Sequence, residues 1–190
     1  RAILDGRKTQ TRRTKGLEEI NKEPGNYEYK KPLFPVEKIG FHYFDEKPPK
    51  GKNATTTKVV KAKCSINDIF WVRETFGVEK AKYKRINYKA GDAAGNVLPV
   101  ESWKPSIHMP KSACRIWLKV TDVRAERLQD IFKNDARKEG IPNAAYSITP
   151  VDSFNKIWES INGKNSWDIN PWVWVYSSER CEMPEGFLKS

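Results

Sequence analysis

The sequence predicts an α+β fold, in which short strands form a small barrel or curled sheet with a few short helices at its margins. Several segments show the alternation or β-branched and aromatic content of strands, whereas the helical signals are few and short. No strand–helix–strand rhythm typical of a parallel sheet is present. The 190 residues contain no internal repeat and no domain-splitting linker. We therefore expect a single domain over residues 1–190.

The sequence of the N-terminal third indicates little regular secondary structure. Residues 1–5 are expected to end a short helix, with Gly6 as its stop. Residues 15–58 are rich in Pro, Gly, Asn, Lys and Glu, with scattered aromatic residues. This composition predicts a long surface insertion that contains one strand near residues 39–44.

The strands are expected mainly in the remainder of the chain. Residues 58–64 and 69–73 are interpreted as two strands joined by a turn, and residues 83–89 as a weaker strand. Residues 115–123 give the clearest strand, because apolar residues occupy one phase and mostly polar residues the other. An aromatic and β-branched strand is expected at residues 172–178.

Two helices are expected near the C-terminal half. Asn134 or Asp135 is a candidate cap for a short helix that ends at Gly140. Residues 152–161 predict a longer helix with one apolar stripe at i, i+3, i+4 and i+7. Four tryptophans are assigned to the core: Trp158, Trp167, Trp172 and Trp174.

The positive charge is unevenly distributed. The chain carries a net charge of +11. Residues 1–16 contribute +5, residues 47–63 contribute +6 and residues 125–190 contribute −2. Clustered Lys and Arg attract phosphates through counterion release, so a polyanionic partner is expected. For residues 47–63 alone, a solvated surface that aids solubility is the alternative.

The three cysteines, Cys64, Cys114 and Cys181, are odd in number and widely spaced. This spacing favours reduced thiols in a cytoplasmic protein over a disulfide framework. It also lacks the close pairs of a zinc site, so neither a metal nor another cofactor is expected. No apolar run has the roughly 20 residues of a membrane helix, and no membrane partner is expected.

Residues 6–13 contain a high density of side chains that can bind or react: three arginines, one lysine and two threonines. Gly6 permits a backbone conformation, or a close approach, that a side chain would block. Arg7, Arg12 and Arg13 can each bind a phosphate through two hydrogen bonds or stack on a base. A basic surface turn is the alternative interpretation.

Lys8 can act as a point charge or, when desolvated, as a base. Lys8 and Thr11 would share one face of a helix but would lie on opposite faces of an extended segment. Together with Gly6 and Arg13 they match the pattern G-x-K-x-x-[ET]-x-R, which resembles the signature of the ASCH family. Further blocks resemble ASCH proteins often encoded by phages and prophages: residues 1–13, 68–75, 103–110, 115–131, 136–141 and 170–175.

The resemblance implies a PUA-like β-barrel with flanking short helices, a fold associated with binding RNA or a modified nucleoside. Some small ASCH proteins are amidohydrolases that remove the acyl group of N4-acetylcytidine with a Lys, a Thr and a Glu. By motif these roles fall on Lys8, Thr11 and, through an A-x-x-E-[GN] stretch, Glu139. Lys8 would then deprotonate Thr11 or a water, and Glu139 would hold the lysine or protonate the leaving amine. An exposed carboxylate at a helix end is the alternative for Glu139.

Two further groups are candidates for binding a nucleoside. In a strand over residues 69–73, Trp71 and Arg73 share a face and would form a wall for base stacking, with a base edge contacted by Glu74. A core tryptophan with a structural Arg–Glu pair is the alternative. His108 lies in an expected loop and would donate to a ligand, or else serve a structural role.

Three functions remain open from sequence. The first is a non-catalytic module that binds RNA, a nucleoside or a nucleotide. The second is a hydrolase of an acylated cytidine, or a ribonuclease that uses the same basic residues. The third is a phage accessory protein that acts through a protein partner.

Overall fold

The computed structural model describes residues 1–31, 40–48, 55–80, 83–92, 94–142 and 148–189. The chain divides into two compact units. The first unit comprises Arg1–Gly6, Ile69–Lys119 and Glu179–Ser190, and the second comprises Arg7–Asp68 and Val120–Ser178. The expectation of one domain stays a prediction, because a single domain can contain two compact parts.

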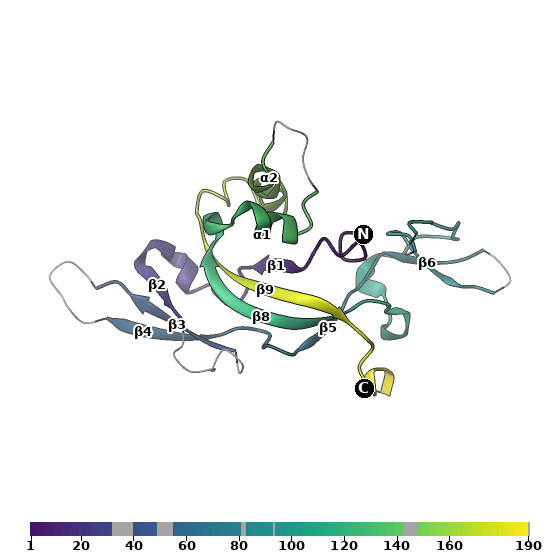
Figure 1. The fold of residues 1–190 in the computed structure, drawn as a ribbon, viewed down its shortest axis with the longest axis horizontal. Coiled ribbons are helices and arrows are strands. Elements are labelled where there is room, and N and C mark those ends of the chain that lie inside the picture. Colours follow the sequence, from purple (N-terminus) through teal and green to yellow (C-terminus); the bar gives the residue numbers. More distant parts are fainter. Residues whose placement is uncertain (32–39, 49–54, 81–82, 93, 143–147, 190) are drawn as a thin grey trace. The chain divides into compact units, whose positions relative to one another are not determined.

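Figure 1 shows the regular elements in chain order. The strands are β1 (Gln10–Arg13), β2 (Tyr27–Lys30), β3 (Phe41–Glu46), β4 (Thr56–Lys61), β5 (Ile69–Trp71), β6 (Phe76–Val78), β7 (Ile86–Tyr88), β8 (Trp117–Arg127) and β9 (Trp172–Cys181). Among the described residues the α-helices are α1 (Lys133–Lys138) and α2 (Pro150–Asn162).

The second unit is built on a curled sheet in which β1, β9 and β8 are neighbours in that order. Strand β1 pairs antiparallel with β9, so that Gln10 lies opposite Ser177 and Arg13 lies opposite Trp174. In Figure 1, β8 and β9 are long curved strands, and α1 and α2 lie over the same face of them. The predicted class, α+β with a curled antiparallel sheet and short helices, is confirmed at this level.

The helix-covered face of the sheet holds one apolar core cluster of the second unit. Helix α2 begins at Pro150 because Thr149 and Asp152 form a reciprocal capping box, two residues before the predicted start. Its Phe154 and Trp158 are buried, and they pack in one cluster with residues of β9, α1 and the neighbouring turns: Val173, Val175, Leu128, Ile131, Ala136 and Ile141. Each large apolar side chain in this cluster contributes about 1.5–3 kcal/mol by leaving water.

The opposite face of β9 packs against aromatic residues of β3. Phe44 contacts Trp172 edge to face, with ring centroids 5.3 Å apart. The His42 ring lies 4.6 Å from that of Trp174, and His42 Nδ1 is 3.0 Å from the Tyr29 hydroxyl. Burial lowers the pKa of His42 to about 4, because an imidazolium there would lose its hydration.

Residues 15–58 contain more structure than expected. Instead of one strand, they hold β2, β3 and the start of β4, which form a three-stranded antiparallel sheet in the order β2-β3-β4. Leu17, Ile20 and Phe44 from this stretch are almost completely buried. The segment therefore contributes to the core of the second unit. Its status as an insertion stays a prediction.

The first unit contains the β5–β8 pair, in which Ile69 lies opposite Lys119, and the β6–β7 pair. Its core is a small cluster around Phe76 and Met109. Residues 1–5 form hydrogen-bonded turns, not the expected helix end, with Asp5 N donating to the Arg1 carbonyl at 3.0 Å. Three apolar residues in this short segment are too few to sustain a helix.

The remaining expected elements differ from the structure mainly at their ends. Helix α1 begins at Lys133 with Phe132 as its N-cap, so neither Asn134 nor Asp135 caps it. Trp158, Trp172 and Trp174 are buried, and Trp167 packs against the helix-side cluster, so the assignment of these four to the core is confirmed.

Candidate functional site: a cationic pocket between β1 and α2

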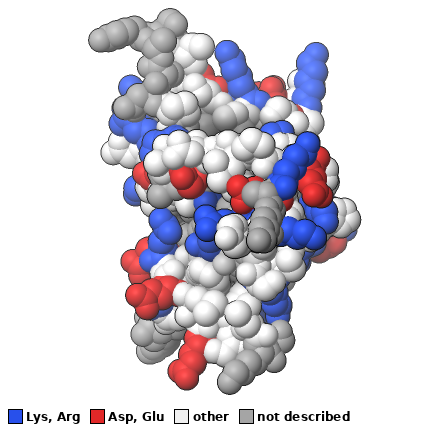
Figure 2. Space-filling model, turned by 90° about the vertical axis from the view of Figure 1, so that its right-hand side faces the viewer, with Lys and Arg blue, Asp and Glu red and all other residues white. Residues whose placement is uncertain are grey.

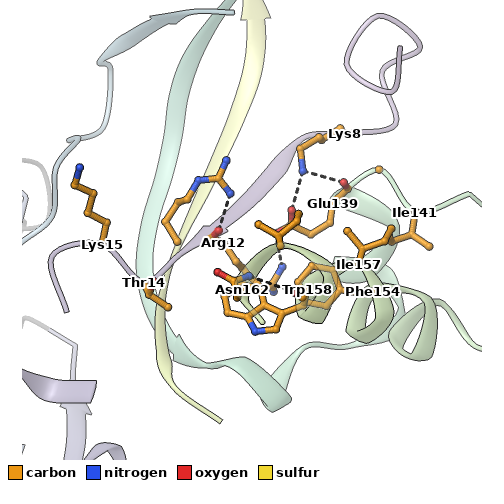
Figure 3. A pocket seen from close by; sticks show the side chains of 13 residues that line it. Lys8, Arg12, Thr14, Lys15, Glu139, Ile141, Phe154, Ile157, Trp158 and Asn162 are labelled. Atoms are coloured by element: carbon orange, nitrogen blue, oxygen red, sulfur yellow. Dashed lines mark hydrogen bonds and ion pairs between the residues drawn. The ribbon is translucent and has the colours of Figure 1, made fainter. Parts of the chain in front are cut away.

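The second unit contains a cavity of about 590 Å³. It is bounded by residues 8–15, which include β1 and are called the β1 segment below, by the end of α1 and by one side of α2. Figure 3 shows its two kinds of wall. Charged side chains, including Lys8 and Glu139, come from the β1 segment and the end of α1. Apolar side chains, including Ile157 and Trp158, come from α2. A pocket of this kind fits a ligand with a planar apolar part and a polar part.

Lys8 and Glu139 are brought together although 131 residues separate them. The Lys8 ammonium donates to Glu139 Oε2 at 2.8 Å and to the Glu139 carbonyl at 2.9 Å. The two backbones also form an antiparallel bridge, and Thr9 N donates to the Lys138 carbonyl at 2.8 Å. Gly140, with a φ of 92°, turns the chain away directly after this contact.

The Glu139 side chain is only 6 % exposed, so the alternative of an exposed helix-end carboxylate is wrong. Each of its oxygens faces a cation, since Lys8 binds Oε2 and Arg12 Nη1 donates to Oε1 at 3.0 Å. An ammonium has three N–H donors, and these contacts use two of those on Lys8. Lys8, whose side chain is 31 % exposed, thus has one donor left for a ligand.

Arg12, a predicted phosphate-binding residue, lies instead in a buried ionic network. Its side chain is 1 % exposed. Besides Glu139, its guanidinium bonds Glu126 through Nε and Nη2 and lies 3.8 Å from Asp135. Arg124 joins Glu126 and Asp135 from β8. Arg12 therefore holds Glu139 in position and has no exposed face for a nucleic acid.

Thr11 is not brought to the Lys8–Glu139 pair. Residues 10–13 are extended, so successive side chains point to opposite faces of the sheet. The Thr11 hydroxyl is buried and has no hydrogen-bond partner among the described residues. The geometry gives no support to a nucleophilic role for Thr11 in this pocket, and that role stays a prediction.

The apolar wall comes from the predicted stripe of α2, which the structure divides between two tasks. Phe154 and Trp158 are buried in the core, as expected of such a stripe. Ile157 and Ile161 are 46 % and 75 % exposed and line the pocket. Two exposed isoleucines beside bound charges form a surface that a nucleobase or a similar flat group would cover.

The positively charged side chains at the rim of the pocket differ in whether a carboxylate or carbonyl of the chain already binds them. Arg13 and Lys15 are exposed and line the pocket. In the part of the chain that the structure describes, neither forms an ion pair with a carboxylate. Arg7 donates to the Gly140 carbonyl at 3.0 Å. Gly6 has a φ of 71°, and a methyl group placed on it would meet nothing within 4 Å, so backbone conformation, not close approach, requires glycine there.

The other predicted binding residues belong to the first unit and do not line this pocket. The Arg73 guanidinium lies 4.8 Å from the Trp71 ring, so the two side chains are neighbours. Their role as a wall for base stacking stays a prediction. Glu74 accepts two hydrogen bonds from Arg115, at 2.8 and 2.7 Å, and its side chain is 9 % exposed. Glu74 is thus engaged in a structural ion pair, with Arg115 and not Arg73. His108 is exposed at the end of a 3₁₀ helix, Ser106–His108.

The charges on the surface are mixed in sign. Figure 2 shows one face of the molecule, on which Lys and Arg side chains stand among Asp, Glu and uncharged residues. Among the described residues, no group of three or more His, Cys, Asp or Glu side chains is arranged to hold a metal ion. None of the described helices combines the length and apolar character needed to cross a membrane.

Comparison with known proteins adds no relative: no family model, no curated protein and no solved structure matches the chain. The function is therefore inferred from the geometry of the site.

The sequence analysis did not assign Glu126, Asp135 or Lys15 to the site. Glu126 and Asp135 bind or approach Arg12 beside Glu139, which was predicted. The alternating charges of Asp122, Arg124 and Glu126 on β8 were a signal of an ionic network. Lys15 carried no such signal, because it lies in a stretch expected to be a loop.

Proposed function

We propose that this chain is an ASCH-type protein with a PUA-like barrel that binds a nucleoside unit of RNA, or a modified nucleoside, in the β1–α2 pocket. The convergence of Lys8 and Glu139 beside the exposed isoleucines of α2 carries the proposal. The base would lie against Ile157 and Ile161. The third N–H of Lys8 would donate to an oxygen of the ligand.

The arrangement favours binding over proton transfer by Glu139. Both of its carboxylate oxygens already accept hydrogen bonds from cations. A carboxylate held in this way orients Lys8, and both of its oxygens are already engaged by donors of this chain. The curled antiparallel sheet with two short helices supports the PUA-like assignment.

Binding is tested by titrating the purified chain with cytidine, N4-acetylcytidine and cytidine monophosphate in a calorimeter. Lys8→Met keeps the length of the side chain and removes its charge, and we expect it to weaken binding about 10- to 100-fold. Lys133→Met, at an exposed lysine of α1 outside the pocket, is the matched control. Absence of binding to all three ligands at millimolar concentration, or equal affinities of the two variants, would overturn the proposal.

Hydrolysis of an acylated cytidine is the second candidate, and the Lys8–Glu139 pair in the pocket favours it. Water would attack the acyl carbon while the Lys8 ammonium stabilises the oxyanion. The bond between the acyl carbon and N4 would then break, and the proton given up by the water would pass to N4, so that acetate and cytidine form. Because Thr11 faces away, we expect Thr11→Val to keep the activity and Lys8→Met to abolish it. Acetate released from N4-acetylcytidine between pH 6 and 9 is the measurement. No release from the wild-type chain would exclude hydrolysis and leave the binding proposal intact.

A further inference from the structure

The two basic segments of the sequence, residues 1–16 and 47–63, meet at their ends in the second unit. The chain leaves β1 through Lys15 and Gly16, and β4 ends at Lys61. A methyl group placed on Gly16 would lie 4.0 Å from the Lys61 carbonyl oxygen and 3.5 Å from Trp174 Nε1. The backbone at Gly16, whose φ is 95°, therefore runs directly beside the end of β4.

This approach places two ammonium groups next to each other. Lys15 and Lys63 are close in space, and the neighbouring ammonium of Lys15, together with some desolvation, lowers the pKa of Lys63. Both lysines are exposed. Two like charges at short distance repel each other, and a bound anion would relieve that repulsion.

One nearby carboxylate offsets the charge of this group only in part. Glu18 interacts with both lysines, and the Gly16 N–H donates to its two oxygens at 3.0 and 2.9 Å. Together with Arg13, the two lysines still outnumber this single carboxylate. Within the described ranges no ion pair involves Arg13, Lys15 or Lys63. We call these three residues the cation track.

The cation track is continuous with the pocket. Arg13 and Lys15 belong to its lining, whereas Lys63 lies beyond it, next to Lys15. Figure 3 shows Lys15 on the far side of Arg12 from Lys8, extending away from α2. A ligand with its base against α2 would thus have positive charge both at Lys8 and along one way out of the pocket.

We infer that the cation track binds the phosphates of a single-stranded nucleic acid whose neighbouring nucleoside occupies the pocket. The natural ligand is then a polynucleotide, not a free nucleoside. This inference rests on the proposed function, because it needs the base in the pocket to place the strand. Each phosphate neutralised by a lysine or arginine releases counterions, which makes binding salt-dependent.

The test compares mononucleotide with oligonucleotide binding. Affinities for cytidine monophosphate are measured by calorimetry, and those for eight-nucleotide RNA and DNA strands by fluorescence anisotropy at several salt concentrations. The double variant Lys15→Gln/Lys63→Gln removes two charges of the track. The control Lys133→Gln/Lys156→Gln removes two exposed lysines of α1 and α2 that lie outside the pocket and the track.

We expect the wild-type chain to bind the octamer at least tenfold more tightly than the mononucleotide. The track variant should lower the slope of log affinity against log salt by about 1.4, since single strands contribute about 0.7 per phosphate contact. Because Lys15 also lines the pocket, the affinity of this variant for the mononucleotide should fall as well, but by a smaller factor than its affinity for the octamer. The RNA and DNA arms show which backbone the track prefers.

Equal binding of octamer and mononucleotide, or equal slopes for the track and control variants, would overturn the inference while the proposed function stands. Binding of neither ligand would overturn both. Tighter binding to vesicles that contain phosphatidylserine, lost in the track variant, would replace the nucleic acid by a lipid surface and would also overturn the inference.

Discussion

The two faces of the β1–β9 pair bury ionisable groups in opposite ways. On the helix-covered face, Arg12 is almost completely buried, and carboxylates of β8 and the end of α1 compensate the charge of its guanidinium. On the aromatic face, His42 is also fully buried, but its contacts are the rings of Tyr29 and Trp174. Burial there holds the imidazole neutral, and the attraction of Asp122 opposes this only in part.

The difference shows what a buried charge needs. A charged side chain is tolerated in a protein interior where several countercharges accept hydrogen bonds from it. A buried titratable group without such partners becomes neutral instead. Because Arg12 is matched in this way, the β1–α2 pocket can keep a charged wall beside the apolar core and still present Lys8 to solvent. The aromatic face around His42 has no such wall.

The largest effect is expected from Arg12→Met, which removes the matched charge. It would leave Glu126 and Glu139 without their shared partner. We expect a loss of about 3–5 kcal/mol in the free energy of unfolding, measured by urea denaturation at pH 7. Arg13→Met, one residue along the same strand, is the control and should change stability by less than about 0.5 kcal/mol. A loss below about 1 kcal/mol for Arg12→Met would show that the network is solvated.

The second prediction concerns pH and the aromatic face. The pKa of His42 is about 4 in the folded state and about 6.5 in the unfolded chain, so only the unfolded chain takes up a proton as the pH falls between these values. The contribution of His42 is complete above pH 6.5 and is lost progressively down to pH 4, by up to about 3 kcal/mol. Urea denaturation from pH 7 to 4 measures it.

His42→Gln keeps a hydrogen-bonding group near Tyr29 and removes the titration. We expect the variant to lose less stability than the wild type between pH 6.5 and 4. An unchanged pH profile would show that other groups cause the acid sensitivity.

The smallest effect is expected from Thr11→Val. The hydroxyl of Thr11 is buried without a partner among the described residues, and valine has nearly the same shape. Removing an unpaired buried polar group should raise the free energy of unfolding by about 0.5–1 kcal/mol. Thermal unfolding measures this. A loss of stability instead would reveal a hydrogen bond to that hydroxyl. Buried polar side chains on both faces of β1 would then have hydrogen-bond partners.

The elements that were predictable from sequence are those whose burial follows a regular apolar pattern. Strands β8 and β9 and helix α2 have this pattern, and the sequence located each of them within a few residues. The sequence Gln-Thr-Arg-Arg of β1 contains no apolar residue, so its alternation is invisible to such reasoning. Its strand conformation comes from pairing with β9 and from the countercharges around Arg12.

The site was predictable only in part, for the same reason. The resemblance brought Lys8 and Glu139 together, and the structure places them in contact. The composition of residues 6–13 assigned Arg12 to the ligand, because composition specifies residue types and not the face each one occupies. Which of Arg12 and Arg13 is buried depends on strand parity and on carboxylates that lie 114 and 127 residues further along the chain.

Strand parity also limits how the length of this segment can vary. In an extended segment, successive side chains point to opposite faces of the sheet. The position of a residue in the segment therefore decides whether its side chain points toward Glu139, as for Lys8 and Arg12, or away from it. Adding or removing a single residue between Lys8 and Arg12 would turn one of them away from Glu139, whereas a change of two residues would keep both on the same side. Homologous chains that retain this pocket should therefore have no single-residue insertion or deletion between these two positions.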